Sequence, residues 1–396
     1  MKKRFLRDIA EIQTGPFGSQ LHKEDYVEVG TPIVTVEHLG SRVFSEQNLP
    51  MVSDADKSRL SKYVLKKGDI VFSRVGSVDR CSFVDQKHDG WMFSGRCLRV
   101  RPSEEVDPLF LYYFFCLNAT KEFVRSIAVG ATMPSINTKL LGEVEVVCPE
   151  IEEQRKIADI LSKIDDKIEE NQKINENLLV QAQTIKKQWV ATNEAGYEML
   201  PLAEVATINP DTYSPKEAWE FVNYLDTSSI TDGFVADIQH IVPSSEKLPS
   251  RARRKVAAGD VLFSTVRPNQ NHFGIISDPL PNMLASTGFA DIRSKNPLVC
   301  NELIYLCLTE GDFIEKMQQL AEQSTSTFPS IKPSDLGACQ IPCPKDGSSN
   351  VFNDTLKTLF SLIAANFREN NSLGAMRDAL LPKLMSGELD VSDIDL

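Results

Sequence analysis

The sequence predicts an α+β protein that contains two copies of one mixed domain and two long helices. Three observations support this prediction: an internal repeat over nearly the whole chain, short apolar strands after Gly-Asp turns in both copies, and two long stretches with heptad periodicity. A length of 396 residues allows two or three domains, each large enough to bury a core. Apolar residues make up 42% of the chain and charged residues 25%, which excludes disordered and collagen-like classes.

The repeat consists of motifs that return in the same order. KKGDIVFSRV at residues 66–75 returns as AAGDVLFSTV at residues 257–266, at an offset of 191 residues. MPSINTKLLG at residues 133–142 returns as FPSIKPSDLG at residues 328–337, at an offset of 195 residues. Because the order is kept and the offset drifts by only a few residues, we interpret the repeat as a duplication. The alternative is chance similarity between short turns.

Each copy begins with a mixed segment of strands and helices. Strands are predicted at residues 32–36, 70–72, 144–147 and 261–263, and helices at residues 109–124 and 303–320. The stretch between the strand at 70–72 and the helix at 109–124 is rich in Gly, Ser and polar residues. This stretch is predicted to form loops on a small sheet.

Two long helices follow the mixed segments. Residues 150–193 contain no Gly or Pro, and the acidic residues at their start suit the positive end of a helix dipole. From Ile157 to Trp189, ten positions step alternately by four and three residues, and eight of them are apolar, which is typical of a coiled-coil seam. A second helix near residues 350–386 matches the first at an offset of 199 residues. The two helices are predicted to pack antiparallel.

Two asparagines occupy matching positions in the two seams. A buried Asn in a seam fixes the register of the helices, and Asn171 and Asn370 are candidates for this role. The alternative is that both face solvent where the seam opens. The predicted parts of the chain are a first mixed domain at 1–149, a first long helix at 150–193, a second mixed domain at 194–346, and a second long helix with an acidic C-terminal tail at 347–396.

The charge distribution and the apolar runs indicate which binding partners and which cellular compartment to expect for this chain. The net charge of −12 argues against nucleic acid, but residues 1–150 have net charge 0 and residues 194–345 have −7, so local basic patches remain possible. The longest apolar run, at residues 109–117, is too short to span a bilayer, and no signal-peptide pattern opens the chain. Eight scattered cysteines without a CxxC pair indicate reduced thiols. We expect a cytoplasmic protein without a membrane partner.

Patterns that indicate catalysis are missing from the sequence. There is no GxxxxGK[ST] phosphate loop, GxGxxG dinucleotide turn, HExxH or GxSxG motif, and the five histidines lack metal-ligand spacing. No catalytic residue, metal ligand or cofactor is therefore predicted for this chain, and a binding protein is favoured. Two alternatives stay open: an enzyme with unrecognised motifs, and a coiled-coil scaffold whose repeated domains bind protein.

Several of these motifs resemble those of a known family. PEIEEQRKIADILSKID at residues 149–165, LLPKLMSGELDV at residues 380–391 and the two GD-containing strands are similar to type I restriction–modification specificity subunits. The second helix departs from the family pattern because it lacks the EEQRKIA start. The resemblance covers essentially the whole chain, and the duplicated order is more specific than any single motif.

The resemblance implies a non-catalytic DNA-recognition subunit. It implies two target-recognition domains, each reading one half of a bipartite, asymmetric site in double-stranded DNA, with the two helices as a ruler between them. It further implies two DNA adenine methyltransferase subunits as partners and, in the complete enzyme, two translocase–nuclease subunits. S-adenosylmethionine, ATP and Mg²⁺ would belong to those partners.

Base reading requires amide, hydroxyl or basic side chains on loops, and phosphate contacts require Arg or Lys. The candidates that follow the repeated strand are Arg74, Ser77 and Arg80 in the first copy and Thr265, Arg267, Asn269, Gln270, Asn271 and His272 in the second. A dense basic run, Arg251, Arg253, Arg254 and Lys255, is a candidate phosphate clamp. An early loop with Gly15, Phe17, Gly18 and Ser19 could also approach DNA, although a structural turn is favoured. The alternative for the other candidates is a solvated surface. Because the two loops differ, the two half-sites are predicted to differ.

Overall fold

The computed structural model describes residues 2–18, 20–235, 237–324 and 328–391 and forms two compact units. Unit 1 contains Met1–Glu170 and Glu369–Leu396, and unit 2 contains Asn171–Arg368. Two long helices, α6 (Ile151–Thr192) and α11 (Asn350–Ser386), contribute residues to both units. The domain boundaries expected from the sequence stay predictions. Of the predicted acidic tail, residues 392–396 lie outside the described residues.

The main elements of the two units follow the same order, although some short elements differ between the units. Those of unit 1 before α6 are β1 (Lys2–Phe5), α1 (Leu6–Ile9), β2 (Ala10–Thr14), η1 (Lys23–Asp25), β3 (Tyr26–Val27), β4 (Thr31–Val34), η2 (Val36–His38), β5 (Met51–Val52), α2 (Asp54–Arg59), η3 (Ser61–Tyr63), β6 (Ile70–Ser73), β7 (Cys81–Phe83), β8 (Met92–Phe93), β9 (Cys97–Pro102), α3 (Pro108–Cys116), α4 (Asn118–Ser126), α5 (Thr138–Leu141) and β10 (Glu145–Cys148). Those of unit 2 between α6 and α11 are β11 (Tyr197–Pro201), α7 (Leu202–Val205), β12 (Ala206–Ile208), η4 (Pro215–Glu217), β13 (Val222–Leu225), η5 (Thr227–Ser229), β14 (Ile230–Thr231), β15 (Phe234–Val235), β16 (Gln239–Ile241), β17 (Ala252–Lys255), β18 (Asp260–Ser264), η6 (Pro268–Gln270), β19 (Phe273–Ile276), β20 (Met283–Ser286), β21 (Phe289–Ser294), α8 (Asn301–Leu308), α9 (Gly311–Glu322), α10 (Pro333–Gly337), β22 (Gln340–Pro344) and η7 (Gly347–Ser349).

The sheets repeat as well. Unit 1 has an antiparallel sheet in the order β2-β9-β6-β7, and unit 2 has its counterpart, β12-β21-β18-β19. A second four-stranded sheet in each unit contains one parallel pair, β4 with β8 in unit 1 and β13 with β20 in unit 2. The strand β1 pairs with β10, and β11 pairs with β22. The predicted α+β class with an internal repeat is confirmed.

The repeated Gly-Asp pair forms the same turn in both units. Gly68 has φ of +90° and Gly259 has φ of +83°, a region that favours glycine. Asp69 and Asp260 follow these glycines, and their carboxylates accept backbone N–H groups of Lys66 at 2.8 Å and Ala257 at 2.6 Å. The turn therefore needs both residues of the pair, which explains why the pair returns in the second copy.

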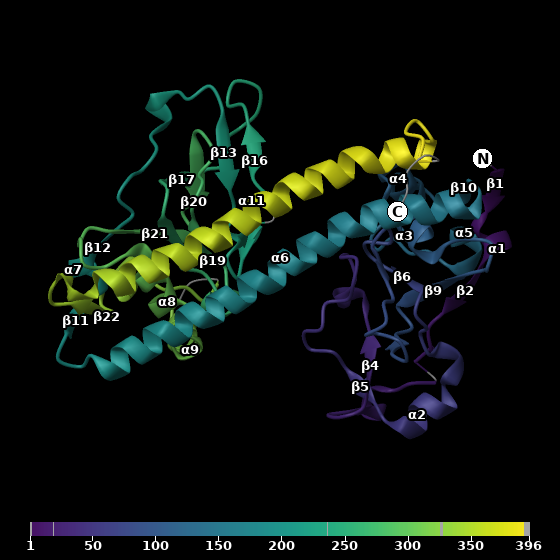
Figure 1. Ribbon diagram of the computed structural model, residues 1–396, viewed down its shortest axis with the longest axis horizontal. Helices are drawn as coiled ribbons and strands as arrows, with labels where there is room; N and C mark the ends of the chain where they lie inside the picture. The colour runs from purple at the N-terminus through teal and green to yellow at the C-terminus, as the bar shows by residue number, and fades with distance from the viewer. Residues whose placement is uncertain (1, 19, 236, 325–327, 392–396) are drawn as a thin grey trace. The chain divides into compact units, whose positions relative to one another are not determined.

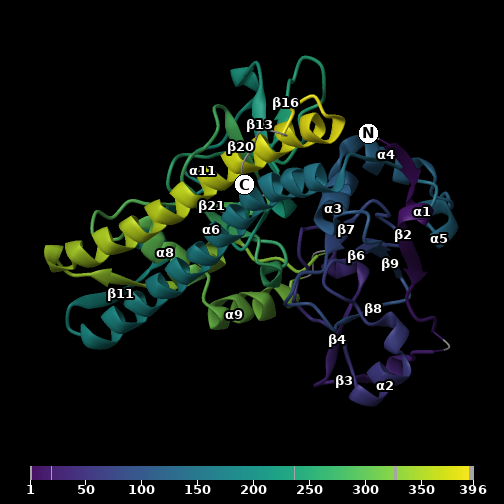
Figure 2. The same cartoon turned by 45° about the vertical axis from the view of Figure 1, so that its right-hand side comes forward.

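The core of each unit lies between the antiparallel sheet, a short apolar helix and the long helices. In unit 1, α3 begins at the N-cap Asp107, whose carboxylate accepts the N–H groups of Leu109 and Phe110. Six consecutive residues of α3, from Phe110 to Phe115, are buried, and full burial of each apolar side chain stabilises by about 1.5–3 kcal/mol. Figures 1 and 2 show α3 beside the N-terminal part of α6.

The helices predicted at residues 109–124 and 303–320 are each broken into two, so those predictions of single helices are wrong. Between α3 and α4, Leu117 is extended, with φ of −58° and ψ of 134°. Between α8 and α9, Glu310 is extended, with φ of −66° and ψ of 140°. No Gly or Pro marks the break at Leu117, whereas Gly311 directly follows Glu310 at the second break and was an available signal.

The two long helices are antiparallel in each unit. In unit 1, Asp165 of α6 contacts Arg377 of α11, and Ile168 contacts Asn370, so the partner number falls as the α6 number rises. In unit 2, Asn175 contacts Asn366, and Trp189 stacks on Phe352 with ring centroids 4.4 Å apart. The predicted antiparallel pairing is confirmed. All eight cysteines lie in the described part of the chain, and none forms a disulfide there. Among the described residues, no helix has the length and apolar character needed to cross a membrane.

Candidate nucleic-acid interface

The first candidate loop, residues 74–80, leaves the sheet of unit 1 at the end of β6. Its two ends are held together because Ser73 N–H donates to the Arg80 carbonyl at 2.9 Å. Arg74 N–H donates to the Arg96 carbonyl at 2.8 Å, and the Arg74 carbonyl accepts the Ile136 N–H at 2.9 Å. The base of the loop is therefore bound by the Pro-Ser-Ile motif.

The second candidate loop, residues 265–272, has the same frame in unit 2. Ser264 N–H donates to the His272 carbonyl at 2.8 Å, and Thr265 N–H donates to the Gly288 carbonyl at 2.8 Å. The Thr265 carbonyl accepts the N–H of Ile331, from the second Pro-Ser-Ile motif, at 2.9 Å. The two repeated motifs are thus adjacent in space in both units. They form a common frame, and the loops that they hold differ in sequence.

The backbone of loop 265–272 is strained and firmly held. Arg267 has φ of +47° and Asn271 has φ of +55°, and the short helix η6 lies between them. Left-handed non-glycine residues cost of order 1–3 kcal/mol each and persist only where the surroundings hold them. Asn271 accepts the Asp232 N–H at 2.9 Å, and Arg267 N–H donates to the Pro329 carbonyl at 2.9 Å. The loop presents Asn269 and Gln270 to solvent.

Each unit exposes an aromatic ring beside the arginine of its loop. The guanidinium of Arg267 lies 4.8 Å from the Phe328 ring centroid, and that of Arg74 lies 5.8 Å from the Phe17 ring centroid. Phe328 is 50% exposed and Phe17 is 55% exposed. A cation over an exposed ring suits contact with bases and phosphates. Sequence reasoning named Phe17 in an early loop that could approach DNA, with a structural turn favoured, and missed Phe328, although Phe328 begins the repeated FPSI motif. Ser19 of the early loop lies outside the described residues.

Several predicted residues use their side chains inside their own unit. Thr265 is buried, and its hydroxyl donates to the Gly288 carbonyl at 2.8 Å. His272 Nδ1 lies 2.7 Å from the Ile230 carbonyl oxygen. Arg80 donates to the Leu39 carbonyl. Ser77, in contrast, is exposed.

The basic run lies on and just before strand β17. Arg253 Nε donates to the Ser250 carbonyl at 3.2 Å, and Lys255 pairs with Glu217 at 2.6 Å. Arg254 is half-buried, and burial lowers the pKa of its guanidinium. Arg251 is exposed, and its carbonyl accepts the N–H of Thr287, next to the Gly288 that holds loop 265–272. The structure therefore brings Arg251 to the base of this loop and ties the other three into the unit.

A buried carboxyl group lies beneath this surface. Asp291 on β21 is fully buried, and neither of its side-chain oxygens has a hydrogen-bond partner among the described residues. Burial, and then the charge of neighbouring Asp260, raise the pKa of Asp291 to about 8. Asp291 is therefore protonated in the folded chain at neutral pH. The corresponding strand position in unit 1 is Arg99, which pairs with Glu11 at 2.6 Å.

We expect Asp291→Asn to stabilise unit 2 at high pH. Between pH about 4 and about 8 the unfolded chain has lost this proton and the folded chain retains it, so stability falls as pH rises through this window. The substitution should raise the free energy of unfolding by about 2–4 kcal/mol at pH 9 and by almost nothing near pH 4. Urea unfolding at both pH values measures this difference. Asp278→Asn, at an exposed acid, is the control, and an equal effect of Asp291→Asn at both pH values would contradict the assignment.

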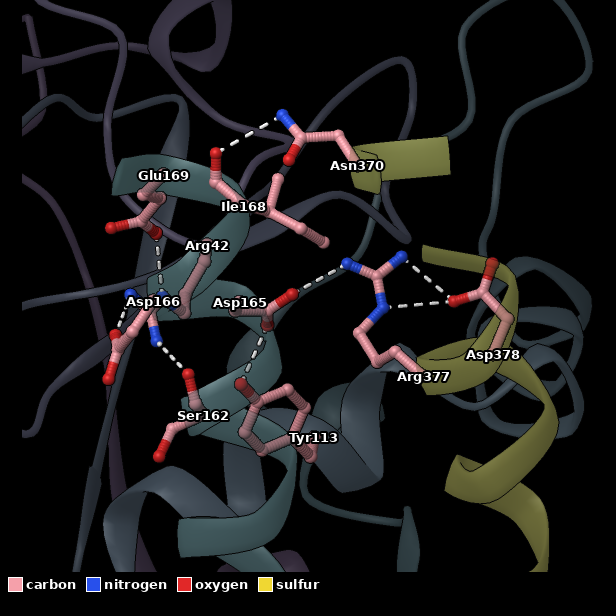
Figure 3. A network of polar contacts seen from close by, with 10 residues as sticks. All are labelled: Arg42, Tyr113, Ser162, Asp165, Asp166, Ile168, Glu169, Asn370, Arg377 and Asp378. Atoms are coloured by element: carbon pink, nitrogen blue, oxygen red, sulfur yellow. Dashed lines mark hydrogen bonds and ion pairs between the residues drawn. The ribbon is translucent and has the colours of Figure 1, made fainter. Parts of the chain in front are cut away.

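A polar network fixes the long helices in unit 1 (Figure 3). The Asp165 carboxylate accepts the Tyr113 hydroxyl at 2.6 Å and Arg377 Nη1 at 2.8 Å. Arg42, from the loop after η2, reaches α6, where Nε donates to Glu169 at 2.8 Å and a second nitrogen donates to Asp166. The network therefore joins the mixed domain, α6 and α11.

The two asparagines predicted to set the register are both near this seam. Asn370 Nδ2 donates to the Ile168 carbonyl at 3.3 Å, and Asn171 is buried. Sequence reasoning missed a pair in unit 2, where Asn366 Nδ2 donates to Asn175 Oδ1 at 2.7 Å. Asn175 is one of the ten seam positions between Ile157 and Trp189, four residues after Asn171, and that position was the available clue.

We expect Asp165→Ala to destabilise unit 1 by about 2–4 kcal/mol, because it leaves the buried Tyr113 hydroxyl and Arg377 without their acceptor. Asp165→Asn keeps an acceptor for Tyr113 and should cost less. Glu170→Ala, at an exposed acid of the same helix, should change stability by less than about 0.5 kcal/mol. Urea unfolding measures all three, and equal losses for Asp165→Ala and Glu170→Ala would refute the role of the network.

Comparison with known proteins agrees with the sequence motifs. Residues 1–179 match the family model of the type I restriction modification DNA specificity domain. The HindI specificity subunit of Haemophilus influenzae is 24% identical over 83% of this chain and 88% of its own length. The MjaIX specificity subunit of Methanocaldococcus jannaschii is 27% identical over 98% of this chain and 93% of its own.

A solved structure shares the fold. The crystal structure of the type I restriction–modification S subunit from M. genitalium covers 97% of this chain and 95% of its own, at 17% identity and a TM-score of 0.57. The resemblance seen in the motifs is thereby confirmed. Residues 1–179 thus match the DNA specificity domain of this family, and the chain as a whole is similar to type I restriction enzyme specificity subunits.

Proposed function

We propose that this chain reads a bipartite, asymmetric DNA site, with one unit for each half-site. One observation carries the proposal: two units of the same fold hold loops 74–80 and 265–272 in the same frame of hydrogen bonds, and the loops differ in sequence. A shared frame places each loop equivalently on its unit, and different side chains read different bases. Similarity to type I restriction enzyme specificity subunits over most of the chain supports the same conclusion.

The side chains assigned to DNA are exposed, apart from Arg74, which is half-buried, and Arg80 also donates to the Leu39 carbonyl. Arg74, Ser77 and Arg80 serve the first half-site, and Arg267, Asn269 and Gln270 serve the second. Arg251 contacts a phosphate near the base of loop 265–272. Thr265, Asn271 and His272 shape that loop, because their side chains or carbonyls bond within unit 2. Arg253, Arg254 and Lys255 contribute positive potential from strand β17.

The long helices set the spacing and carry the partners. Helix α6 has 42 residues, which corresponds to about 60 Å of helix. Half-sites one turn of DNA apart lie about 34–36 Å apart, within the reach of such a rod. The chain carries two DNA adenine methyltransferase subunits and, in the complete enzyme, translocase–nuclease subunits. S-adenosylmethionine, ATP and Mg²⁺ bind to those partners, and the assembly acts on DNA in the cytoplasm.

A map of modified bases in the host genome, with and without this gene, tests the proposal. We expect deletion to abolish methylation of one two-part motif, whose halves and spacer the map then gives. An unchanged map, with the methyltransferase captured on this chain by pull-down, would refute it. The competing function, a scaffold that binds only protein, predicts an assembled complex whose DNA binding is absent or independent of salt.

A further inference from the structure

The second short helix of each unit occupies the same place in the repeat. Helices α4 and α9 begin at Asn118 and Gly311, which are 193 residues apart. The same offset relates their buried residues Val124 and Met317. The next residue of each helix is Arg125 in unit 1 and Gln318 in unit 2, so these two positions are equivalent.

Both of these side chains bind the candidate DNA loop of their own unit. Arg125 Nη1 lies 2.6 Å from Asp79 Oδ2, in loop 74–80. Gln318 Oε1 accepts the backbone N–H of Asn269, in loop 265–272, at 3.3 Å. Gln318 Nε2 donates to Glu322 at 2.9 Å, which fixes the side-chain amide with its oxygen towards the loop. Equivalent helix positions thus perform the same task with different chemistry.

We propose that Arg125 and Gln318 are positioning residues that set the conformation of the two recognition loops and thereby the sequence preference at each half-site. The inference rests on the proposed function, because it requires that these loops read DNA. Neither residue needs to touch a base. A bidentate base contact depends on direction, so a loop displaced by a lost anchor reads its base less selectively.

The contacts of Arg125 and Gln318 can set the loop conformation but contribute little to the stability of the two units. The Arg125 side chain is 52% exposed and that of Asp79 is 17% exposed, and an ion pair with one exposed partner contributes less to stability than a buried pair. The contact of Gln318 is a single hydrogen bond to one backbone amide. Their removal therefore leaves both units folded and changes the loops, and the two effects can be measured separately.

The test uses the assembled methyltransferase complex with the full chain, and methylated sites are mapped genome-wide. Gln318→Ala and Arg267→Ala should affect the same half-site. We expect Gln318→Ala to increase methylation about tenfold at sites that carry a single-base change in this half-site. Discrimination at the other half-site should be unchanged. Arg125→Ala should relax the opposite half-site, as Asp79→Ala does. Gln318→Met, which has a similar length but no acceptor, should act like Gln318→Ala.

Matched controls come from the same helices. Gln319→Ala and Lys121→Ala alter neighbouring polar side chains that make no hydrogen bond to the loops among the described residues, and they should leave the motif unchanged. Exchange of the charges by Asp79→Arg with Arg125→Asp should restore strict reading of the first half-site. An unchanged motif in both alanine variants would overturn the inference, as would equal loss at both half-sites. A wild-type complex without any two-part motif would overturn the proposed function itself.

Discussion

Replacement of Arg101 or Arg293 by alanine is expected to lower the free energy of unfolding of its own unit by about 3–5 kcal/mol. Arg101 Nε and Nη2 each lie 2.7 Å from an oxygen of Asp69, and Arg293 binds both oxygens of Asp260, at 2.7 and 2.8 Å. Asp69 is 1% exposed and Asp260 is 0% exposed. Loss of the guanidinium therefore leaves a buried carboxylate without its counter-charge.

Hydrogen exchange can assign each loss to one unit. In Arg101→Ala, amides of β6 and β9 should exchange faster while those of β18 and β21 stay protected, and Arg293→Ala should give the reverse pattern. Arg155→Ala is the matched control, because Arg155 pairs with Glu152 at the surface of α6. Similar small losses for Arg101→Ala and Arg155→Ala would show that the buried pair contributes little.

These two Arg–Asp pairs also show which features could be predicted from the sequence. The Gly-Asp turns at Asp69 and Asp260 were predictable because two adjacent residues return within a longer motif. Their partners Arg101 and Arg293 are also related by the repeat, at an offset of 192 residues, but a single arginine has no pattern around it. Apolar periodicity likewise predicted the long helices and the main strands, because both are local in the chain. It missed the break at Leu117, where backbone direction changes and hydrophobicity does not.

The candidate interface was located by the same repeat. The repeated strand ends where the two loops begin to differ, so the position of each loop could be predicted without a structure. The roles of individual side chains could not, because they depend on contacts over long sequence distances. Thr265 bonds to Gly288, and Gln318 reaches Asn269 from another helix. Arg254 is half-buried on β17, although in sequence it resembles the exposed Arg251.

The second large effect is expected for Arg267→Ala. Arg267 is the first residue of loop 265–272 with a positive φ. Its side chain is exposed and lies over the Phe328 ring. If its guanidinium makes a base contact, its loss should cost about 1–3 kcal/mol of discrimination, or roughly 5- to 150-fold, at one position of one half-site. Methylation rates on duplexes with single-base changes in each half-site measure this effect.

The variant Arg267→Lys separates base reading from charge. Lysine keeps the positive charge but loses the planar pair of donors, so discrimination should fall while the salt dependence of binding is retained. Lys295→Ala removes one charge elsewhere on unit 2, where Lys295 donates to the Ala203 carbonyl, and should leave discrimination intact. Undiminished discrimination in Arg267→Ala would assign Arg267 to the loop frame. Relaxation at both half-sites would instead mean that Arg267 affects the whole assembly. All of its described contacts lie in unit 2, so a base contact of Arg267 would change discrimination at one half-site only.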